Sequence, residues 1–470
     1  METAGLFMLA AVTVGMIGTG LPAFVVLIAV ALVFGCLGMV TGDVPWSLLT
    51  ALPLRLVGLL ESDVLQALPL YVFMGALLHR LPLAERLFRS ATAAFGRMGA
   101  APALAGLLLG GVLAPMNGSV GASVATLARV VHPPLRARGV DDADNLAIIS
   151  AASTLGVIVP PSLVLILFGD TMMRAHTEAQ NVTRGTARII NTQDMFHGAL
   201  IPAALLLLCS AGIIWWRGRR VVARPEEPVG PGDWIIGGAT LAFVGGLLAA
   251  VATGWLYAVE AAAFGGVALG VYGIATRSLD RTALDAVLRT TLVVTGALFA
   301  LFVGATGFSL VLRAFGTDHL LATIISGLPG GAVGAMLAVL LLLGLCALVL
   351  DAFEIILVVI PVVMPPLLMR APDAVWAGVL ALLALQASFL VPPVGYAIMM
   401  ARTQLADDLK FRRMFAALAP FLAAQLLILA LVFCFPVLVH LIGAGNDPMP
   451  VRSGTEAAGM LNSMLPPAEE

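Results

Sequence analysis

The sequence predicts an all-α integral membrane protein with an inverted structural repeat, two re-entrant hairpins and proline-broken helices. Of its 470 residues, 60% are hydrophobic and only 11% are charged, and the mean hydropathy is +1.03. A soluble domain carries about 25% charged residues, so this chain lacks the polar surface that water requires. Its apolar runs do not alternate polar and apolar residues as barrel strands do, which favours spanning helices.

Composition also excludes several classes of function. The net charge is −2 and no basic tract stands alone, which excludes nucleic acid as a partner. The four cysteines and six histidines are scattered singly, without the paired spacing of a metal site. We therefore expect neither an enzyme nor a bound cofactor.

Charged and Pro/Gly interruptions divide the chain into about a dozen apolar pieces, and roughly 20 residues are needed to span a bilayer. Residues 4–40 break at Gly20-Leu21-Pro22 and predict two helices. Residues 43–64 mix acids with leucines, as an interfacial connection does. The sequence predicts N-terminal scaffold helices and a connection at 1–99, a first repeat with a cytoplasmic-side hairpin at 100–216 and a polar linker at 217–233. It predicts further scaffold helices at 234–319, a second repeat with a periplasmic-side hairpin at 320–401, and a C-terminal helix and tail at 402–470.

Two interrupted segments predict the hairpins. The segment 100–131 is interrupted at 115–119, and each arm has about 13 to 16 residues, too few to cross. The second hairpin is expected within 320–364, with Asp351 and Glu354 at its tip. Each hairpin is followed by a proline-broken run, at Pro160-Pro161 in 142–169 and at Pro392-Pro393 in 374–401. The other crossings are expected at 65–79, 195–216, 234–254, 255–276, 290–312 and 414–440, joined by loops at 80–97, 171–194, 277–289 and 402–413, a polar linker at 217–233 and an unstructured tail beyond Gly443.

The two halves share a sequence repeat. Residues 130–161 match 362–393 at 11 of 32 positions without a gap, including both Pro-Pro pairs. Five predicted crossings separate the copies, and an odd number inverts the second copy. Segments on one predicted side hold 18 of the 25 Lys and Arg residues, which identifies that side as cytoplasmic. Inverted repeats with broken helices are the architecture of secondary transporters, whose sites lie where the breaks expose backbone carbonyls.

The first candidate ion site lies where the first hairpin tip faces the first broken helix. The tip is Asn117-Gly118-Ser119, and the break contains Ser153, Thr154 and Gly156. The prolines that follow donate no N–H, so upstream carbonyls near Gly156 lose their helical donors. Together with the hydroxyls of Ser119, Ser153 and Thr154, these carbonyls form an oxygen cage suited to Na⁺. The alternative is a kinked helix whose hydroxyls bond back to their own backbone.

The equivalent residues of the second half are Asp351 and Glu354 at the tip and Gln386 and Ser388 before the proline pair. A carboxylate at the bilayer centre costs about 2.5–3.5 kcal/mol, and the i, i+3 spacing places both acids on one helix face. We therefore expect a cation or a buried partner, with Glu354, Gln386 and Ser388 as ligands of a second Na⁺. The alternative is a tip that reaches the interface, where water solvates both acids.

These segments resemble a known family. The run from Asn117 to Ser162, with NGSVGAS and STLGVIVPPS, and the run from Leu350 to Tyr396, with LDAFEIILVVIPVVMPP and LQASFLVPPVGY, are similar to the large membrane subunit (DctM-type permease) of tripartite ATP-independent periplasmic (TRAP) transporters. The resemblance implies an elevator-type transporter of the bacterial inner membrane. It also implies Na⁺-driven uptake of an organic acid such as a dicarboxylate, a periplasmic solute-binding protein, and a small four-helix membrane subunit. The family usually has Thr where Val391 precedes the second proline pair.

Other functional classes make different predictions. A stand-alone divalent-anion/Na⁺ symporter of similar architecture needs no binding protein. An ion channel predicts rings of charge along a continuous pore rather than isolated polar tips. A membrane enzyme predicts clusters of His or Cys, which this sequence lacks.

Overall fold

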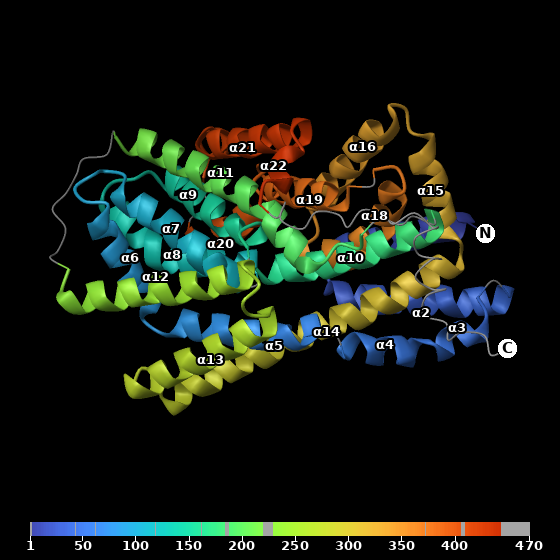
Figure 1. Cartoon of the computed structure of the whole chain (residues 1–470), viewed down its shortest axis with the longest axis horizontal. Helices are drawn as coiled ribbons and strands as arrows, with labels where there is room; N and C mark the ends of the chain where they lie inside the picture. Colours follow the sequence, from blue (N-terminus) through green and yellow to red (C-terminus); the bar gives the residue numbers. More distant parts are fainter. Residues whose placement is uncertain are drawn as a thin grey trace, which may run out of the picture.

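The computed structural model describes residues 2–42, 44–61, 63–117, 119–160, 162–183, 188–219, 229–371, 373–405 and 409–442. Within these ranges the fold is entirely helical (Figure 1). The first half contains α1 (Glu2–Thr19), α2 (Ala23–Thr41), α3 (Trp46–Thr50), α4 (Leu52–Leu60), α5 (Asp63–Arg80), α6 (Leu83–Ala94), α7 (Ala101–Asn117), α8 (Val120–Ala137), α9 (Asp142–Thr154), the 3₁₀ turn η1 (Leu155–Val157), α10 (Leu163–Thr183) and α11 (Thr192–Gly218). The second half contains α12 (Pro231–Ala252), α13 (Ala258–Ala275), α14 (Arg281–Ala314), α15 (Thr317–Gly327), α16 (Gly331–Cys346), α17 (Ala352–Glu354), the π-helical η2 (Ile355–Val359), α18 (Ile360–Leu368), α19 (Ala374–Ser388), α20 (Tyr396–Leu405), α21 (Phe411–Cys434) and α22 (Val437–His440).

Six of the described helices are long and apolar enough to cross a membrane: α2, α11, α12, α13, α14 and α21. The bent pair of α5 and α6, which meet at 64°, makes a seventh if it counts as one span. Outward-facing apolar side chains are common on these helices; for example, Leu292 is 73% exposed and Leu427 is 65% exposed. Such surfaces require a lipid or protein environment, which confirms the prediction of a multi-pass membrane protein.

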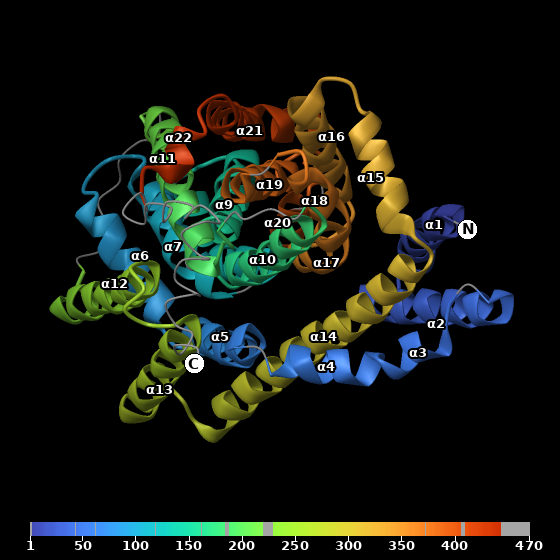
Figure 2. The ribbon, with the colours of Figure 1, turned by 45° about the vertical axis from the view of Figure 1, so that its right-hand side comes forward.

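The helices form a central bundle and a set of flanking helices (Figure 2). The bundle contains α7 to α11 and α17 to α21, whereas α14 runs beside it in contact with α2, α4 and α5. Within the bundle, α10 packs on α18 of the second hairpin, and α20 packs on α8 of the first. The helices that follow the two breaks, α10 and α20, therefore each cover an arm of the hairpin in the other half.

The structure confirms the breaks that the sequence predicts. Helix α1 ends before Gly20, whose φ of 63° lies in the left-handed region that glycine favours, and α2 starts at Ala23. Helix α7 continues through Pro115 to Asn117 and α8 begins at Val120, so the first interruption is shorter than the predicted 115–119. Pro160 stands between η1 and α10, and Pro392-Pro393 stands between α19 and α20. The same order of elements occurs in both halves. The inverted orientation of the halves stays a prediction.

Three predicted loops, at 80–97, 171–194 and 277–289, are wrong over part of their length, because charged residues there form or continue a helix. Helix α6 (Leu83–Ala94) occupies most of the first of these segments. Helix α14 begins at Arg281, where Asp280 caps it by accepting a hydrogen bond from the Ala283 amide at 2.7 Å. Helix α10 continues to Thr183, through an i, i+4 ion pair of Arg174 with Asp170 at 2.9 Å. Gly118, Pro161, most of the linker and the tail from Gly443 lie outside the described residues.

Candidate functional site

The first broken helix ends in a tight turn. Helix α9 stops at Thr154, η1 covers Leu155–Val157, and the amides of Ile158 and Val159 both reach back to the Leu155 carbonyl, at 3.2 and 2.9 Å. Ser153, Thr154 and Gly156 are all buried here. The sequence therefore correctly locates the break, and the backbone around it is irregular in the interior of the protein.

Both hydroxyls of the first break donate to their own helix. Ser153 Oγ donates to the Ser150 carbonyl at 2.9 Å, and Thr154 Oγ1 donates to the Ala151 carbonyl at 3.0 Å. Both hydroxyls therefore bond back to the backbone of their own helix, which is the alternative to a Na⁺ site that the sequence left open. Each oxygen keeps lone pairs that accept a further partner, so the geometry leaves both side chains able to ligate a cation.

The first hairpin arm rests directly on this break. A Cβ placed on Gly156 would lie 2.6 Å from the backbone oxygen of Ala114 in α7, and one placed on Gly110 would lie 2.6 Å from the backbone oxygen of Ala152 in α9. The two glycines allow α7 to approach α9 and η1 more closely than side chains permit. The hairpin and the broken helix are therefore in backbone contact.

The first tip lies against the start of α20. Ser119 is extended, with φ −139° and ψ 136°, and its carbonyl accepts bonds from the amide and the hydroxyl of Ser123 at 3.1 and 3.0 Å. A Cβ placed on Gly121 would lie 3.4 Å from the Tyr396 hydroxyl and 3.6 Å from Ser119 Oγ. Asn117 ends α7, and its side chain, like Gly118, lies outside the described part.

The acids at the second tip form a capping box. Asp351 is the N-cap of α17 and accepts a hydrogen bond from the Ala352 amide at 2.7 Å, while Glu354 Oε2 accepts one from the Asp351 amide at 3.1 Å. Both side chains are only partly buried. The box gives these acids a local structural role that the sequence analysis missed, although the Asp-x-x-Glu spacing before an apolar run indicates it.

Tyr396 lies near both tips. Its hydroxyl interacts electrostatically with Asp351 and Glu354 and also lies beside Gly121 of the first hairpin. Tyr396 is not among the site residues predicted from the sequence, although it stands three residues after Pro393 of the second proline pair. The structure therefore brings Ser119, Asp351 and Glu354 to a common region around this ring.

Gln386 is the least satisfied polar group of the second break. It lies in the last turn of α19, its side chain is fully buried at 0% exposure, and neither Nε2 nor Oε1 has a hydrogen-bond partner. The neighbouring Ser388 hydroxyl donates to the Ala384 carbonyl at 2.8 Å. An unpaired buried amide costs about 1–3 kcal/mol, a cost that a ligand or a buried water would offset.

Long apolar helices, short hairpin arms and interior helix breaks with polar side chains together define a multi-pass membrane permease. The chain matches the family model "Tripartite ATP-independent periplasmic transporter, DctM component" over residues 9–438, and it belongs to that family. It is therefore a transporter permease subunit of the bacterial inner membrane and not an enzyme, as the sequence predicts.

Relatives of known function support this assignment. The chain is 24% identical over 435 residues to the sialic acid TRAP transporter large permease protein SiaM of Vibrio cholerae, with 90% of this chain and 94% of that protein covered. It is 23% identical over 391 residues to the C4-dicarboxylate TRAP transporter large permease protein DctM of Rhodobacter capsulatus, with 81% and 86% covered. The crystal structure of the Alcanivorax borkumensis YdaH transporter, described as having an unusual topology, shares the fold, with a TM-score of 0.63, 16% identity, and 95% of this chain and 99% of that chain covered.

Proposed function

We propose that this permease subunit couples Na⁺ entry to the uptake of an organic acid, a dicarboxylate or a related carboxylate, by an elevator motion of the hairpin bundle. A periplasmic solute-binding protein delivers the acid, and a small four-helix membrane subunit braces the flanking helices. The family supports these partners, and the relatives named for sialic acid and C4-dicarboxylates support a carboxylate substrate.

The observation that carries the Na⁺ proposal is the unpaired amide of Gln386. Its Oε1 has no donor within the fully buried end of α19, and a carbonyl-type oxygen is a ligand that Na⁺ accepts. Glu354 and Ser388 complete the proposed second site. The first site takes the oxygens of Ser119, Ser153 and Thr154 with a backbone carbonyl at Gly156. Val391 contributes no side-chain ligand, which increases the dependence of the second site on Gln386.

A matched pair of substitutions tests this assignment. Gln386→Ala removes the proposed ligand, whereas Gln425→Ala removes another buried glutamine, 5% exposed with its Oε1 unpaired, from α21 outside both breaks. In proteoliposomes containing all partners, Gln386→Ala should raise the Na⁺ concentration for half-maximal uptake by about tenfold, the equivalent of one lost ligand at about 1.4 kcal/mol. The substrate KM should change much less, and Gln425→Ala should change neither.

Two results would contradict the proposal. Equal effects of both substitutions would assign Gln386 to packing alone. Uptake that ignores Na⁺ and follows a proton gradient would instead make Asp351 and Glu354 the carriers, as intramembrane carboxylates often are. Ser119→Ala and Thr154→Val test the first site in the same assay.

The stand-alone symporter is the second candidate. No described segment outside the membrane helices is long enough to fold a capture domain, which favours delivery by a separate protein. Reconstituting the chain alone and then adding each partner separates the two mechanisms. Full Na⁺-coupled uptake of free substrate by the lone chain would favour the symporter.

A further inference from the structure

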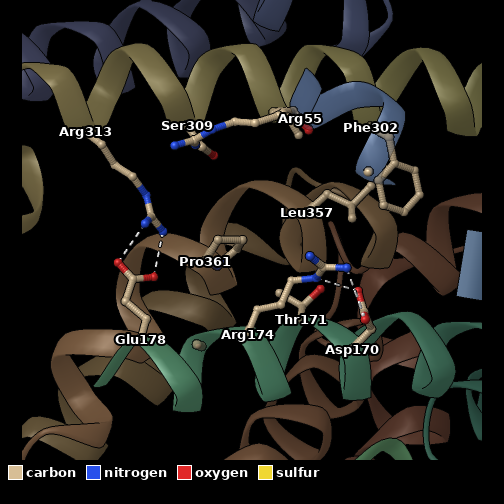
Figure 3. Close-up of a pocket in the computed structure, with 14 residues that line it drawn as sticks. Arg55, Asp170, Thr171, Arg174, Glu178, Phe302, Ser309, Arg313, Leu357 and Pro361 are labelled. Atoms are coloured by element: carbon tan, nitrogen blue, oxygen red, sulfur yellow. Dashed lines mark hydrogen bonds and ion pairs between the residues drawn. The ribbon is translucent and has the colours of Figure 1, made fainter. Parts of the chain in front are cut away.

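A polar cavity of about 540 Å³ lies between α4, α10, α14 and the segment η2 to α18 (Figure 3). It opens between the long flanking helix α14 and the bundle helix α10, and by the predicted topology it faces the periplasmic side. None of the proposed Na⁺ ligands lines it. Leu357 and Pro361, which follow the second tip along the chain, form part of its wall. The cavity is therefore a separate site beside the second hairpin.

Three arginines reach this cavity, and two of them are already paired with carboxylates. Arg313 of α14 makes a two-pronged bond to Glu178 of α10, at 2.7 and 2.8 Å. Arg174 pairs with Asp170 one turn away on the same helix at 2.9 Å. Figure 3 shows both pairs on the walls of the cavity. The two pairs show that the site already favours planar contacts between guanidinium and carboxylate groups.

Arg55 is the remaining guanidinium. It extends from α4 towards Ser309 of α14, and none of the described carboxylates forms an ion pair with it. The lining therefore carries three arginines against two acids, a surplus of one positive charge. Asp318 lies outside the lining, 3.8 Å from Arg313, and does not reach Arg55. The surplus charge is located where α4 faces α14.

Two hydroxyl residues of α14 line the same cavity as Arg55. Thr306 and Ser309 lie three residues apart on α14, so they share one helix face, and both line the cavity. Their hydroxyls can donate to an anionic oxygen that Arg55 pairs with. A guanidinium fork with neighbouring hydroxyl donors is the arrangement that binds a carboxylate group.

We propose that this cavity is a binding site for an organic anion, with Arg55 pairing its carboxylate and Ser309 and Thr306 supplying hydrogen bonds. The Arg313–Glu178 and Arg174–Asp170 pairs form the walls, and because both of these carboxylates are already paired, neither neutralises Arg55. A ligand here touches α4 and α14 on one side and α10 on the other. The site is independent of the Na⁺ ligands, so each proposal can fail alone.

A cysteine placed in the cavity reports on its charge and occupancy. In a background lacking the four native cysteines, Thr306→Cys is reacted in phosphatidylcholine nanodiscs with anionic sulfonatoethyl and cationic trimethylammonioethyl methanethiosulfonate. The anionic reagent should react faster. Arg55→Gln should lower the ratio of anionic to cationic rates at least about fivefold, because it removes the surplus charge. Arg281→Gln, at the opposite end of α14, is the control and should leave the ratio unchanged.

Succinate provides the occupancy test. It should slow modification of Thr306→Cys by the anionic reagent, and Arg55→Gln should abolish this protection, whereas Gln386→Ala should preserve it. Ser309→Cys repeats the measurement if Thr306→Cys does not fold. A rate ratio insensitive to Arg55→Gln, or no protection by succinate, overturns the proposal. Protection by phosphatidylglycerol to which succinate adds nothing would assign the cavity to a lipid headgroup and also overturn it.

Discussion

Close packing of α7 on the first broken helix provides a sharp test of the fold. Gly110 and Gly111 are adjacent, buried residues of α7. A Cβ on Gly110 would lie 2.6 Å from the Ala152 backbone oxygen, whereas one on Gly111 would lie 3.5 Å from the nearest atom, a flexible methyl of Leu207. We predict that Gly110→Ala destabilises the protein and that Gly111→Ala does not.

The size of the effect follows from the contacts. Both substitutions gain about 1 kcal/mol of helix propensity, and this gain cancels in the difference between the variants. The overlap at Gly110 involves backbone, which cannot rotate away, so the overpacking cost is about 1–3 kcal/mol. At Gly111 the contact is an ordinary van der Waals distance and costs little. Gly110→Ala should therefore be less stable than Gly111→Ala by about 1–3 kcal/mol.

Thermal unfolding of the purified variants in one detergent measures this difference. We expect the midpoint temperature for loss of monodisperse protein to be several degrees lower for Gly110→Ala than for Gly111→Ala. The wild-type midpoint should equal that of Gly111→Ala or lie slightly below it. Gly156→Ala, which meets the Ala114 backbone oxygen at 2.6 Å, should behave like Gly110→Ala. Equal midpoints for Gly110→Ala and Gly111→Ala would refute the close approach of α7 to α9.

Three further predictions concern helix ends and topology. Arg217→Gln should lower the free energy of unfolding by about 1–3 kcal/mol. It removes the ion pair with Asp144 at 2.8 Å and two hydrogen bonds to carbonyls of α21 at 2.8 and 2.9 Å. A change below about 0.5 kcal/mol in thermal unfolding would contradict those bonds. Asp280→Ala should lower the free energy of unfolding by about 1 kcal/mol, because it removes the N-cap of α14. Asp285→Ala, at an exposed position of the same helix, should change it little. Equal losses of stability in the two variants would show that the cap does not stabilise the helix. Single cysteines at Glu178 and at Arg217 should label from the periplasmic and cytoplasmic sides respectively, and labelling from one common side would refute the inverted topology.

The breaks in the fold are predictable from sequence because they depend on local chemistry. Gly20 followed by Pro22 stands at a helix break, as do Pro160 and the pair Pro392-Pro393. The other two proline pairs, Pro133-Pro134 and Pro365-Pro366, lie inside α8 and α18, so a proline pair alone does not decide a break. The extent of α10 and α14 is less predictable, since Arg174 and Arg281 read as loop residues by charge alone. Their helical state depends on an ion pair in α10 and an N-cap at the start of α14, which hydropathy alone does not indicate.

The site is only partly predictable for the same reason. Ser119, Gln386 and Ser388 could be selected because they stand at breaks, and Asp351 with Glu354 because charge is rare in these runs. That Gln386 lacks any partner, or that Ser153 donates to its own helix, is a property of the packed interior. The Arg55 cavity joins helices far apart in the chain, and no local pattern indicates it.

The crossed packing of the two halves has a mechanical consequence. Helix α10 packs on α18, and α20 packs on α8. A movement of either hairpin arm therefore changes the contacts of a helix that begins at the break in the other half. A cation that alters one tip can therefore act on the second through direct van der Waals contact over one or two helices. Communication between the proposed ion sites would need no long-range relay.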